Sequence, residues 1–162
     1  MIRYAKAGDH AAIADVLTAA FGRPDEARLV ERLRADEDTL FELVAEEDGE
    51  VCGHILFSRL WADRVDLYGA LAPLAVHPSR HRQGLGAKLV RTGVEYAREF
   101  GCFGLLVLGD PAYYGRFGFS AAAAEAVASP YRGLAAFQAL ALEEDAFLGP
   151  LSVTYPDAFA SS

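Results

Sequence analysis

Residues 71–86 read LAPLAVHPSRHRQGLG, and this stretch decides the fold. The apolar run 71–76 predicts a strand, which His77-Pro78 ends. Directly after the two glycines, apolar residues recur at helical spacing and predict an amphipathic helix. Its apolar stripe consists of Leu85, Leu89, Tyr96, Ala97 and Phe100. The order is therefore strand, turn, helix, with one face of the helix on a sheet and the other in water.

The turn Gly84-Leu85-Gly86 is a candidate anion site. The first N–H groups of a helix have no partner inside it and carry partial positive charge. Glycines let an anion approach that backbone, so the turn suits a phosphate or pyrophosphate, with an ordinary tight turn as the alternative. A dinucleotide fingerprint would need glycine at Leu89, and a phosphate loop would need Gly-Lys-Ser/Thr at 86–88. The sequence excludes both of these motifs.

Four basic residues surround this turn on a chain that is acidic overall. The net charge is −8, from 15 basic and 23 acidic residues, which disfavours a nucleic acid as the main partner. The basic residues near the turn are Arg80, Arg82, Lys88 and Arg91. Such a local patch favours a polyanionic ligand, and a solvated helix face is the alternative.

A second strand and a short helix follow. The apolar run 103–108 lies between glycines and predicts a buried strand, parallel to the first because a helical crossover joins them. Asp110 suits an N-cap, Pro111 the first helical position and Gly118 the C′ position. We therefore expect a helix of about two turns after the second strand.

Three motifs now stand at fixed spacing. They are Leu74-Ala75-Val76-His77-Pro78, then Arg82-Gln83-Gly84-Leu85-Gly86, then Tyr113-Tyr114-x-x-Phe117-Gly118-Phe119. Together they resemble the acetyl-CoA-binding core of the GNAT superfamily of N-acetyltransferases, strongly over the middle third of the chain. The resemblance implies an α/β fold with one mixed sheet of about seven mostly antiparallel strands, a parallel splayed central pair, and helices on both faces.

The resemblance also implies the ligands and the residues that hold them. Acetyl-CoA would be the acyl donor, without a metal. The cofactor-binding residues implied are Leu74, Ala75, Val76, Arg82, Gln83, Gly84, Leu85, Gly86 and Ala87. This chain departs from many relatives at His81, and at Val107–Asp110, where they carry Asn. Many relatives are dimers, which leaves a homodimer open here.

The length of the chain predicts a single domain over residues 1–162, and the resemblance implies that it is an N-acetyltransferase domain. It is 52% hydrophobic and 23% charged, and no apolar segment approaches the roughly 20 residues of a membrane span. The first four residues lack the form of a signal peptide, so we expect a cytoplasmic protein. Cys52 and Cys102 are expected to be buried thiols, and Pro78 makes a helical metal site at His77 and His81 improbable.

The outer segments complete the expected sheet. Residues 2–5 predict an edge strand, and Asp9 and Pro24-Asp25 are expected to begin two helices. Asp48-Gly49 predicts a hairpin between 40–46 and 51–61, followed by a strand over 65–76. Two closing strands are expected at 137–142 and 151–155, and residues 121–128 permit no assignment. Since proline cannot donate to a ladder, Pro73 predicts that the parallel strands part near it.

Acyl transfer from a thioester to an amine needs a polarised carbonyl, a proton for the leaving thiolate and a neutral nucleophile. For the carbonyl we expect the N–H of Ala75 or Val76, and for the proton the catalytic Tyr114, which the family likeness singles out. A general base is missing, because the chain has 70–72 Ala-Leu-Ala where some relatives carry Glu. Water-linked substitutes would be Asp110, Glu46 and Asp66, and His54 is expected in the core.

The leading hypothesis is an acetyl-CoA-dependent N-acetyltransferase that acts on a primary amine of a small molecule or peptide. The absent base leaves open a non-catalytic CoA-binding sensor or interaction domain. A generic phosphate-binding α/β protein is a third reading, and it would show no preference for CoA over ATP. Release of the CoA thiol with a panel of amines separates the enzyme from both.

Overall fold

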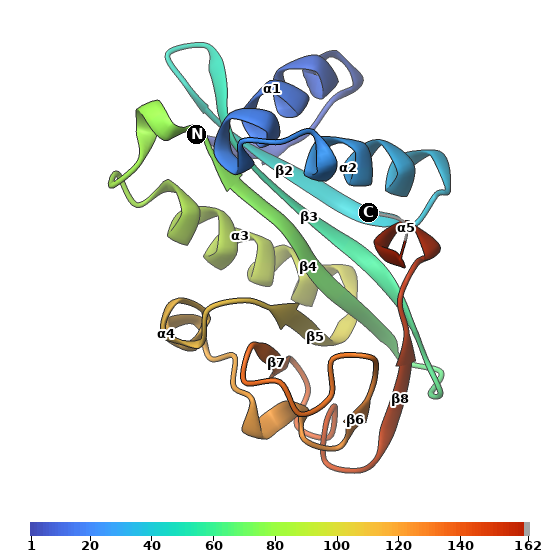
Figure 1. Ribbon diagram of the computed structural model, residues 1–162. Coiled ribbons are helices and arrows are strands. Elements are labelled where there is room, and N and C mark those ends of the chain that lie inside the picture. The colour runs from blue at the N-terminus through green and yellow to red at the C-terminus, as the bar shows by residue number, and fades with distance from the viewer. Residues whose placement is uncertain (161–162) are drawn as a thin grey trace.

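The structure is a computed structural model and describes residues 1–160. A single mixed sheet forms the centre of the molecule (Figure 1). Its main path runs β1-β2-β3-β4-β5-β7, and β8 pairs with the far end of β3 and with β6. The strands are β1 Ile2–Tyr4, β2 Thr39–Glu47, β3 Glu50–Ala62, β4 Leu67–Val76, β5 Cys102–Leu108, β6 Val127–Ala128, β7 Phe137–Ala141 and β8 Leu151–Thr154. Within the main path, β4 and β5 are parallel and the other neighbours are antiparallel.

Helices cover both faces of this sheet, as expected (Figure 1). The α-helices are α1 His10–Phe21, α2 Asp25–Ala35, α3 Leu85–Phe100, α4 Pro111–Tyr114 and α5 Asp157–Ala160. Short 3-10 turns cover Ala7–Asp9, Pro78–Arg80, Gly115–Phe117 and Ala122–Ala124. The helices α1 and α2 bury an apolar stripe against one face, and α3 packs on the other. The two-residue strand β6 is the one that the sequence did not predict.

Helix α3 shows why the apolar stripe positions the glycine turn. Leu85 and Leu89 are buried against the sheet, and Gly93 lies so close to Phe57 that an added Cβ would stand 2.8 Å from that ring. This close packing fixes the helix axis and thereby the position of its first turn. Phe100 departs from the expected stripe, being 49% exposed, because it is the last residue of the helix; its ring still contacts Phe41.

Two local expectations have different outcomes. The Asp48-Gly49 turn is confirmed, since both residues adopt positive φ, as the tight hairpin turn requires. Asp9 is the N-cap residue of α1, as expected, but its carboxylate makes no capping hydrogen bond to that helix. Its carboxylate accepts a hydrogen bond from the N–H of Lys6 at 2.7 Å and pairs with Arg3 at 2.8 Å. Asp9 therefore closes the preceding 3-10 turn and fastens it to β1.

The parallel strands β4 and β5 part near the middle of the sheet. Their pairing runs from Leu67 opposite Cys102 to Leu71 opposite Val107, and no later pair joins them among the described residues. The register of β4 against β3 also shifts between Leu71 and Leu74, the interval that contains Pro73. The predicted parting of the strands is confirmed, and it opens one edge of β4 over its last residues.

A buried charged group underlies α2. His54 is fully buried, as expected of a core histidine, and its Nε2 lies 2.8 Å from Oε1 of Glu42, while its Nδ1 has no partner. Arg34 of α2 donates two hydrogen bonds of 2.8 Å to the same carboxylate. Burial alone would raise the pKa of Glu42, but these partners lower it to about 2. The group therefore joins α2 to β2 and β3 through an ionised carboxylate.

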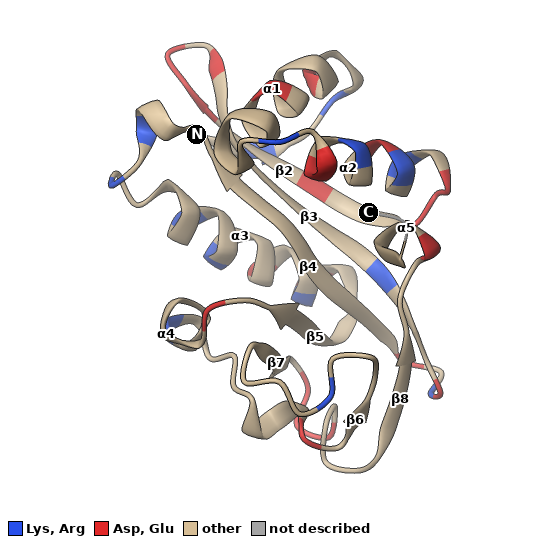
Figure 2. Cartoon of the chain, in the orientation of Figure 1, with Lys and Arg blue, Asp and Glu red and all other residues tan. Residues whose placement is uncertain are grey.

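Most charged side chains lie on the helices and loops, while most of the sheet is apolar (Figure 2). Cys52 and Cys102 are free and buried, as expected. Among residues 1–160, none of the helices is long and apolar enough to cross a membrane.

Candidate active site

A cavity of about 390 Å³ lies at the start of α3. Gly84 is the N-cap, with φ of 75°, and as glycine it offers no side chain to the first N–H groups of the helix. Those groups belong to Leu85, Gly86 and Ala87, all of which line the cavity. Gly86 also makes room for Tyr113, whose hydroxyl would stand 2.8 Å from an added Cβ. The turn thus presents unpartnered amides to an open space.

Positive charge gathers around this cavity. Arg80, Arg82 and Arg116 line it, and the Arg116 guanidinium lies 4.7 Å from the centre of the Tyr113 ring. Arg116 was not among the basic residues expected at the turn. Lys88 and Arg91 were expected there but do not line the cavity, because they lie further along α3. The lining therefore combines three cations with helix-end amides, which suits a polyphosphate.

The sequence-predicted ligand residues fall into two groups. Leu74, Val76, Arg82, Gly84, Leu85, Gly86 and Ala87 line the cavity, whereas Ala75 and Gln83 do not. The Ala75 side chain is buried on the α1–α2 face of the sheet. The N–H of His77 donates to Cys52 of β3 at 2.8 Å, so the alternation along an antiparallel pair directs the Ala75 N–H to β3 as well. By the same alternation, the N–H groups of Leu74 and Val76 face the gap.

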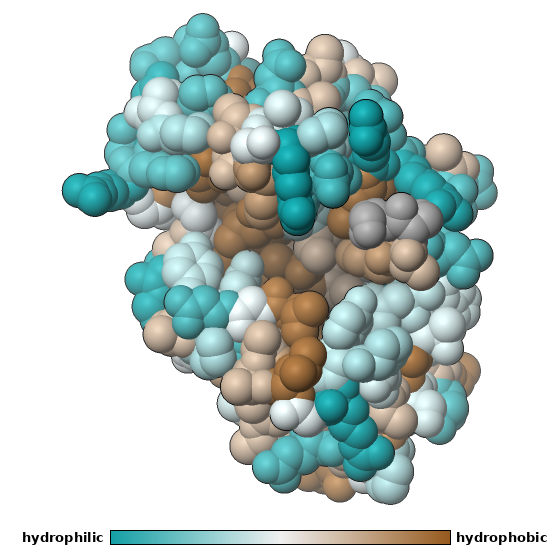
Figure 3. All heavy atoms as spheres, viewed as in Figure 1, coloured by the Kyte–Doolittle hydropathy of each residue, from teal (hydrophilic) through white to brown (hydrophobic). Residues whose placement is uncertain are grey.

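A second cavity, of about 330 Å³, occupies the gap between β4 and β5. Residues 70–74 of β4 and 106–109 of β5 and its following turn line two of its sides. The molecular surface is hollowed at this place, and the hollow is mainly apolar (Figure 3). Leu74 lines both cavities, so the cavity at the glycine turn and the cavity in the gap adjoin each other.

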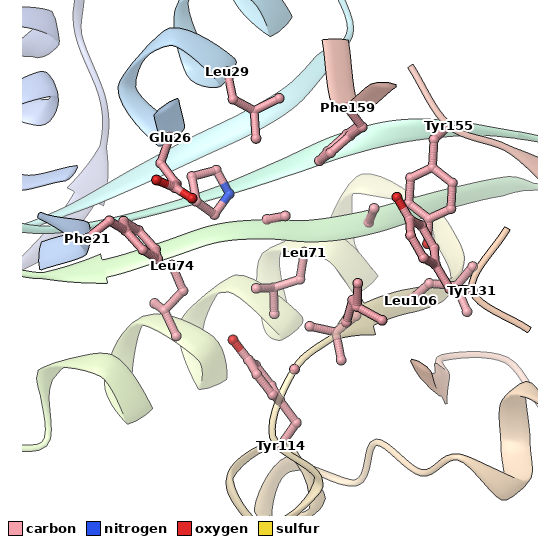
Figure 4. A pocket seen from close by; sticks show the side chains of 16 residues that line it. Phe21, Glu26, Leu29, Leu71, Leu74, Leu106, Tyr114, Tyr131, Tyr155 and Phe159 are labelled. Atoms are coloured by element: carbon pink, nitrogen blue, oxygen red, sulfur yellow. The ribbon is translucent and has the colours of Figure 1, made fainter. Parts of the chain in front are cut away.

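Tyr114 enters the gap from α4, with its hydroxyl directed into the cavity (Figure 4). Asp110 caps α4 by accepting from the Ala112 N–H at 3.0 Å, as predicted, and Pro111 begins the helix. The Tyr114 ring packs so closely on Gly109 that an added Cβ there would lie 2.5 Å from ring carbon Cε2. Burial, with a smaller effect of Tyr113, raises the pKa of Tyr114 to about 12. The phenol is therefore protonated at neutral pH.

None of the three acidic residues considered as a base lies in the gap cavity. Asp110 caps α4, Glu46 pairs with Arg3 at 3.3 Å, and Asp66 pairs with Arg64 at 2.8 Å. The carboxylate that does line the cavity is Glu26, in the first turn of α2. Sequence reasoning missed Glu26 as a site residue.

The two histidines near the turn have structural partners. Nδ1 of His77 accepts from the Ser79 N–H at 3.1 Å, and Nε2 of His81 lies 3.0 Å from the Val76 carbonyl. Within residues 1–160, no group of three or more His, Cys, Asp or Glu side chains is arranged to hold a metal ion.

A mixed sheet with one parted parallel pair, a glycine turn with unpartnered amides at the head of α3 and a tyrosine in the gap define the class of α/β acetyltransferases. The chain belongs to the acetyltransferase (GNAT) family, whose model matches residues 10–119.

Relatives of known sequence and structure agree with this assignment. The uncharacterized N-acetyltransferase YjhQ of Escherichia coli K12 is 42% identical over 122 residues, which cover 72% of this chain and 67% of that protein. The crystal structure of the GNAT N-acetyltransferase YhbS of E. coli, in complex with CoA, has a TM-score of 0.91 and 36% identity, covering 99% of this chain and 91% of that one. A GNAT acetyltransferase from Brucella melitensis in complex with acetyl-CoA has a TM-score of 0.81 and 35% identity, covering 98% and 97%.

Proposed function

We propose that this protein transfers an acetyl group from acetyl-CoA directly to a primary amine. The observation that carries the proposal is the junction of the two cavities at Leu74. One extended ligand with a polyphosphate head and a thioester tail can lie across that junction, with the head at the glycine turn and the tail in the gap. The crystal structures of the relatives from E. coli and B. melitensis contain CoA and acetyl-CoA, which supports the same choice of ligand.

The residues at the turn fit the anionic part of acetyl-CoA. The N–H groups of residues 85–87 would hold the diphosphate, with charge supplied by Arg82 and its neighbours Arg80 and Arg116. Gln83 belongs to the same turn, and we propose that it lies beside the bound diphosphate. The open edge of β4 would bind the pantetheine arm as an added strand does, through backbone hydrogen bonds.

The same edge suggests which amide polarises the thioester carbonyl. The ladder alternation speaks against Ala75 and leaves the N–H groups of Leu74 and Val76 free to face the gap. Leu74 also lines the cavity that contains the Tyr114 hydroxyl, whereas Val76 does not. We therefore assign the carbonyl to the Leu74 N–H and the pantetheine arm to Val76.

The acetyl-CoA thioester supplies the activated acyl group. An ammonium substrate first loses one proton to solvent, and its nitrogen lone pair then forms a C–N bond to the carbonyl carbon. The C–S bond breaks, the thiolate takes the proton of the Tyr114 hydroxyl, and the new amide nitrogen releases its extra proton to water. Tyr114 regains a proton from solvent. The products are the acetamide, the CoA thiol and one net proton.

The acidity of Tyr114 must match that of the leaving group. A thiol with a pKa of roughly 8.5 in water is a stronger acid than a phenol with a pKa of about 12, so transfer would cost about 5 kcal/mol if the thiolate stayed fully hydrated. The thiolate forms in the same largely apolar cavity, where burial raises the pKa of a thiol too. Both groups therefore shift in the same direction, which reduces the mismatch.

Release of the CoA thiol on addition of amines tests the proposal. The wild type should release thiol, and Tyr114→Phe should lower kcat by about 10²-fold to 10⁴-fold with acetyl-CoA affinity retained. Unchanged kcat in Tyr114→Phe would remove the hydroxyl from the mechanism. Tight binding of CoA with no thiol release for any amine would favour the non-catalytic sensor instead.

A homodimer, a cytoplasmic location and a single domain over residues 1–162 stay predictions.

A further inference from the structure

The gap cavity carries one charge at one end and aromatic rings at the other (Figure 4). Among its lining residues that the structure describes, Glu26 is the only one whose side chain is ionised at neutral pH. Glu26 lies at the end where Phe21 and Leu74 also lie, and Tyr131 and Tyr155 lie at the opposite end. The remaining walls are largely apolar. This distribution of charge and apolar surface indicates the charge and shape of the acceptor.

We infer that the acceptor is a small primary monoamine with an apolar, preferably aromatic body, whose ammonium group is recognised by the Glu26 carboxylate. The inference rests on the proposed acetyl transfer and specifies its second substrate. The ammonium group would lie beside Leu74, where the proposal places the thioester, and the body of the substrate would extend towards the aromatic end.

The surroundings of Glu26 prepare it to bind a cation. Its side chain is only 14% exposed, whereas that of its partner Arg23 is 58% exposed. Arg23 donates two hydrogen bonds to the carboxylate, Nε to Oε1 at 3.0 Å and Nη2 to Oε2 at 2.6 Å. A carboxylate accepts about four hydrogen bonds, so each oxygen keeps the capacity for a ligand. Arg23 thus orients Glu26 from the solvent side and leaves its cavity side available.

Glu26 is suited to binding rather than to proton removal. The hydrogen bonds from Arg23 lower the pKa of Glu26 below the usual range of a carboxyl group, so Glu26 is ionised at neutral pH. An anion that is so weakly basic is a poor general base for an ammonium group at neutral pH. The proton of the substrate therefore goes to solvent, as in the proposed reaction, and Glu26 acts as a specificity-determining residue.

The aromatic end is built from distant parts of the chain. Tyr155 follows β8 and packs edge to face with Tyr131, with ring centres 5.2 Å apart, and with Phe159 of α5, 5.6 Å apart. Burial raises the pKa of Tyr155, so its phenol is neutral. Rings held against one another in this way form a rigid apolar wall, which favours an aromatic or branched aliphatic body over a second charged group.

The size and charge of the cavity exclude larger or multiply charged acceptors from tight binding. Its volume of about 330 Å³ is at the lower end of the roughly 300–1,000 Å³ that small-molecule sites occupy. A polyamine or a lysine-rich peptide would place a second ammonium group against the aromatic wall, without a counter-ion among the lining residues that the structure describes.

The experiment compares 2-phenylethylamine with spermidine and a lysine-containing peptide, all with saturating acetyl-CoA. We expect kcat/KM to be at least about 10-fold higher for 2-phenylethylamine, because a second ammonium group left without a partner against the aromatic wall costs at least about that factor. A higher kcat/KM for spermidine or the peptide would overturn the inference while supporting acetyl transfer. Failure of every amine to release thiol would instead overturn the proposed function.

A binding measurement isolates the role of Glu26 from any role in proton transfer. N,N-dimethyl-2-phenylethylamine is a cation that cannot form a stable acetamide, and 2-phenylethanol is a neutral analogue. As inhibitors of the wild type, the cation should bind about 10-fold to 100-fold more tightly, and Glu26→Gln should remove this difference. The same preference in Glu26→Gln would overturn the assignment.

Two further variants control this measurement. Glu31→Gln makes the same charge change on the exposed side of α2 and should keep the wild-type preference. Glu26→Asp retains the charge and should keep part of it. An unchanged KM for acetyl-CoA in Glu26→Gln shows that the variant is folded.

Discussion

Replacing Gly109 by Ala should impair catalysis, because the added Cβ would displace the ring of Tyr114. The new Cβ would lie 2.5 Å from Cε2 and 2.9 Å from Cδ2 of Tyr114, whereas carbon atoms in contact are about 3.5–4.0 Å apart. The backbone cannot give way easily, because the Gly109 N–H donates to the Ala136 carbonyl at 3.0 Å and its own carbonyl accepts from the buried Gln138 at 3.1 Å. The ring must therefore shift by about 1 Å.

A misplacement of about 1 Å costs on the order of 10²-fold in rate, so Gly109→Ala should lower kcat by about that factor. The assay is thiol release at saturating acetyl-CoA and amine. Gly115→Ala is the matched control, because Gly115 adjoins Tyr114, has helical φ and ψ, and has nothing within 4 Å of an added Cβ. It should keep kcat close to the wild-type value.

A double variant decides whether the loss acts through the hydroxyl. In a Tyr114→Phe background the hydroxyl is already absent, so Gly109→Ala should lower kcat little further. Full additivity of the two losses, or wild-type kcat in Gly109→Ala alone, would refute the reasoning that the position of the Tyr114 hydroxyl limits the reaction.

Three further changes test the site and the fold. Since burial raises the pKa of Tyr114 to about 12, the phenol stays protonated in alkaline solution, and kcat should not fall between about pH 8 and 10. A fall of kcat centred near pH 10 would contradict the role of Tyr114 as an acid. Glu42→Gln should lower the free energy of unfolding by about 3 kcal/mol at neutral pH, because the pKa of Glu42 is lowered from 4.5 to about 2. This stabilisation is present above about pH 4.5 and is lost as the pH falls towards 2. The free energy of unfolding of the variant in urea should therefore depend less on pH over that window than that of the wild type. Gly93→Ala should destabilise the protein by about 1–3 kcal/mol in urea unfolding, because the added Cβ would lie 2.8 Å from the Phe57 ring. Gly149→Ala is the control, because no atom lies within 4 Å of an added Cβ there, and it should have no such effect. Equal stability of the two variants would contradict the close packing of α3.

The central segment was predictable because local rules govern it. The apolar run of β4, the two glycines, the periodic stripe of α3 and the cap at Asp110 each determine their structure through neighbours within a few residues. Pro73 even indicated where the strands part. The motifs of this segment also carried the family resemblance, which the match over residues 10–119 confirms.

The sequence by itself thus determined the order of strand, turn and helix, the position of the glycine turn and the family. Only the tertiary structure decided which residues line the gap between β4 and β5. It brings Glu26 from the second helix and Tyr155, which follows the last strand, to one cavity, and it directs the Ala75 N–H to β3 because His77 pairs with Cys52. The physical reason is that these contacts join residues far apart in the chain, so they depend on which elements pack together and in which register, which no local pattern specifies.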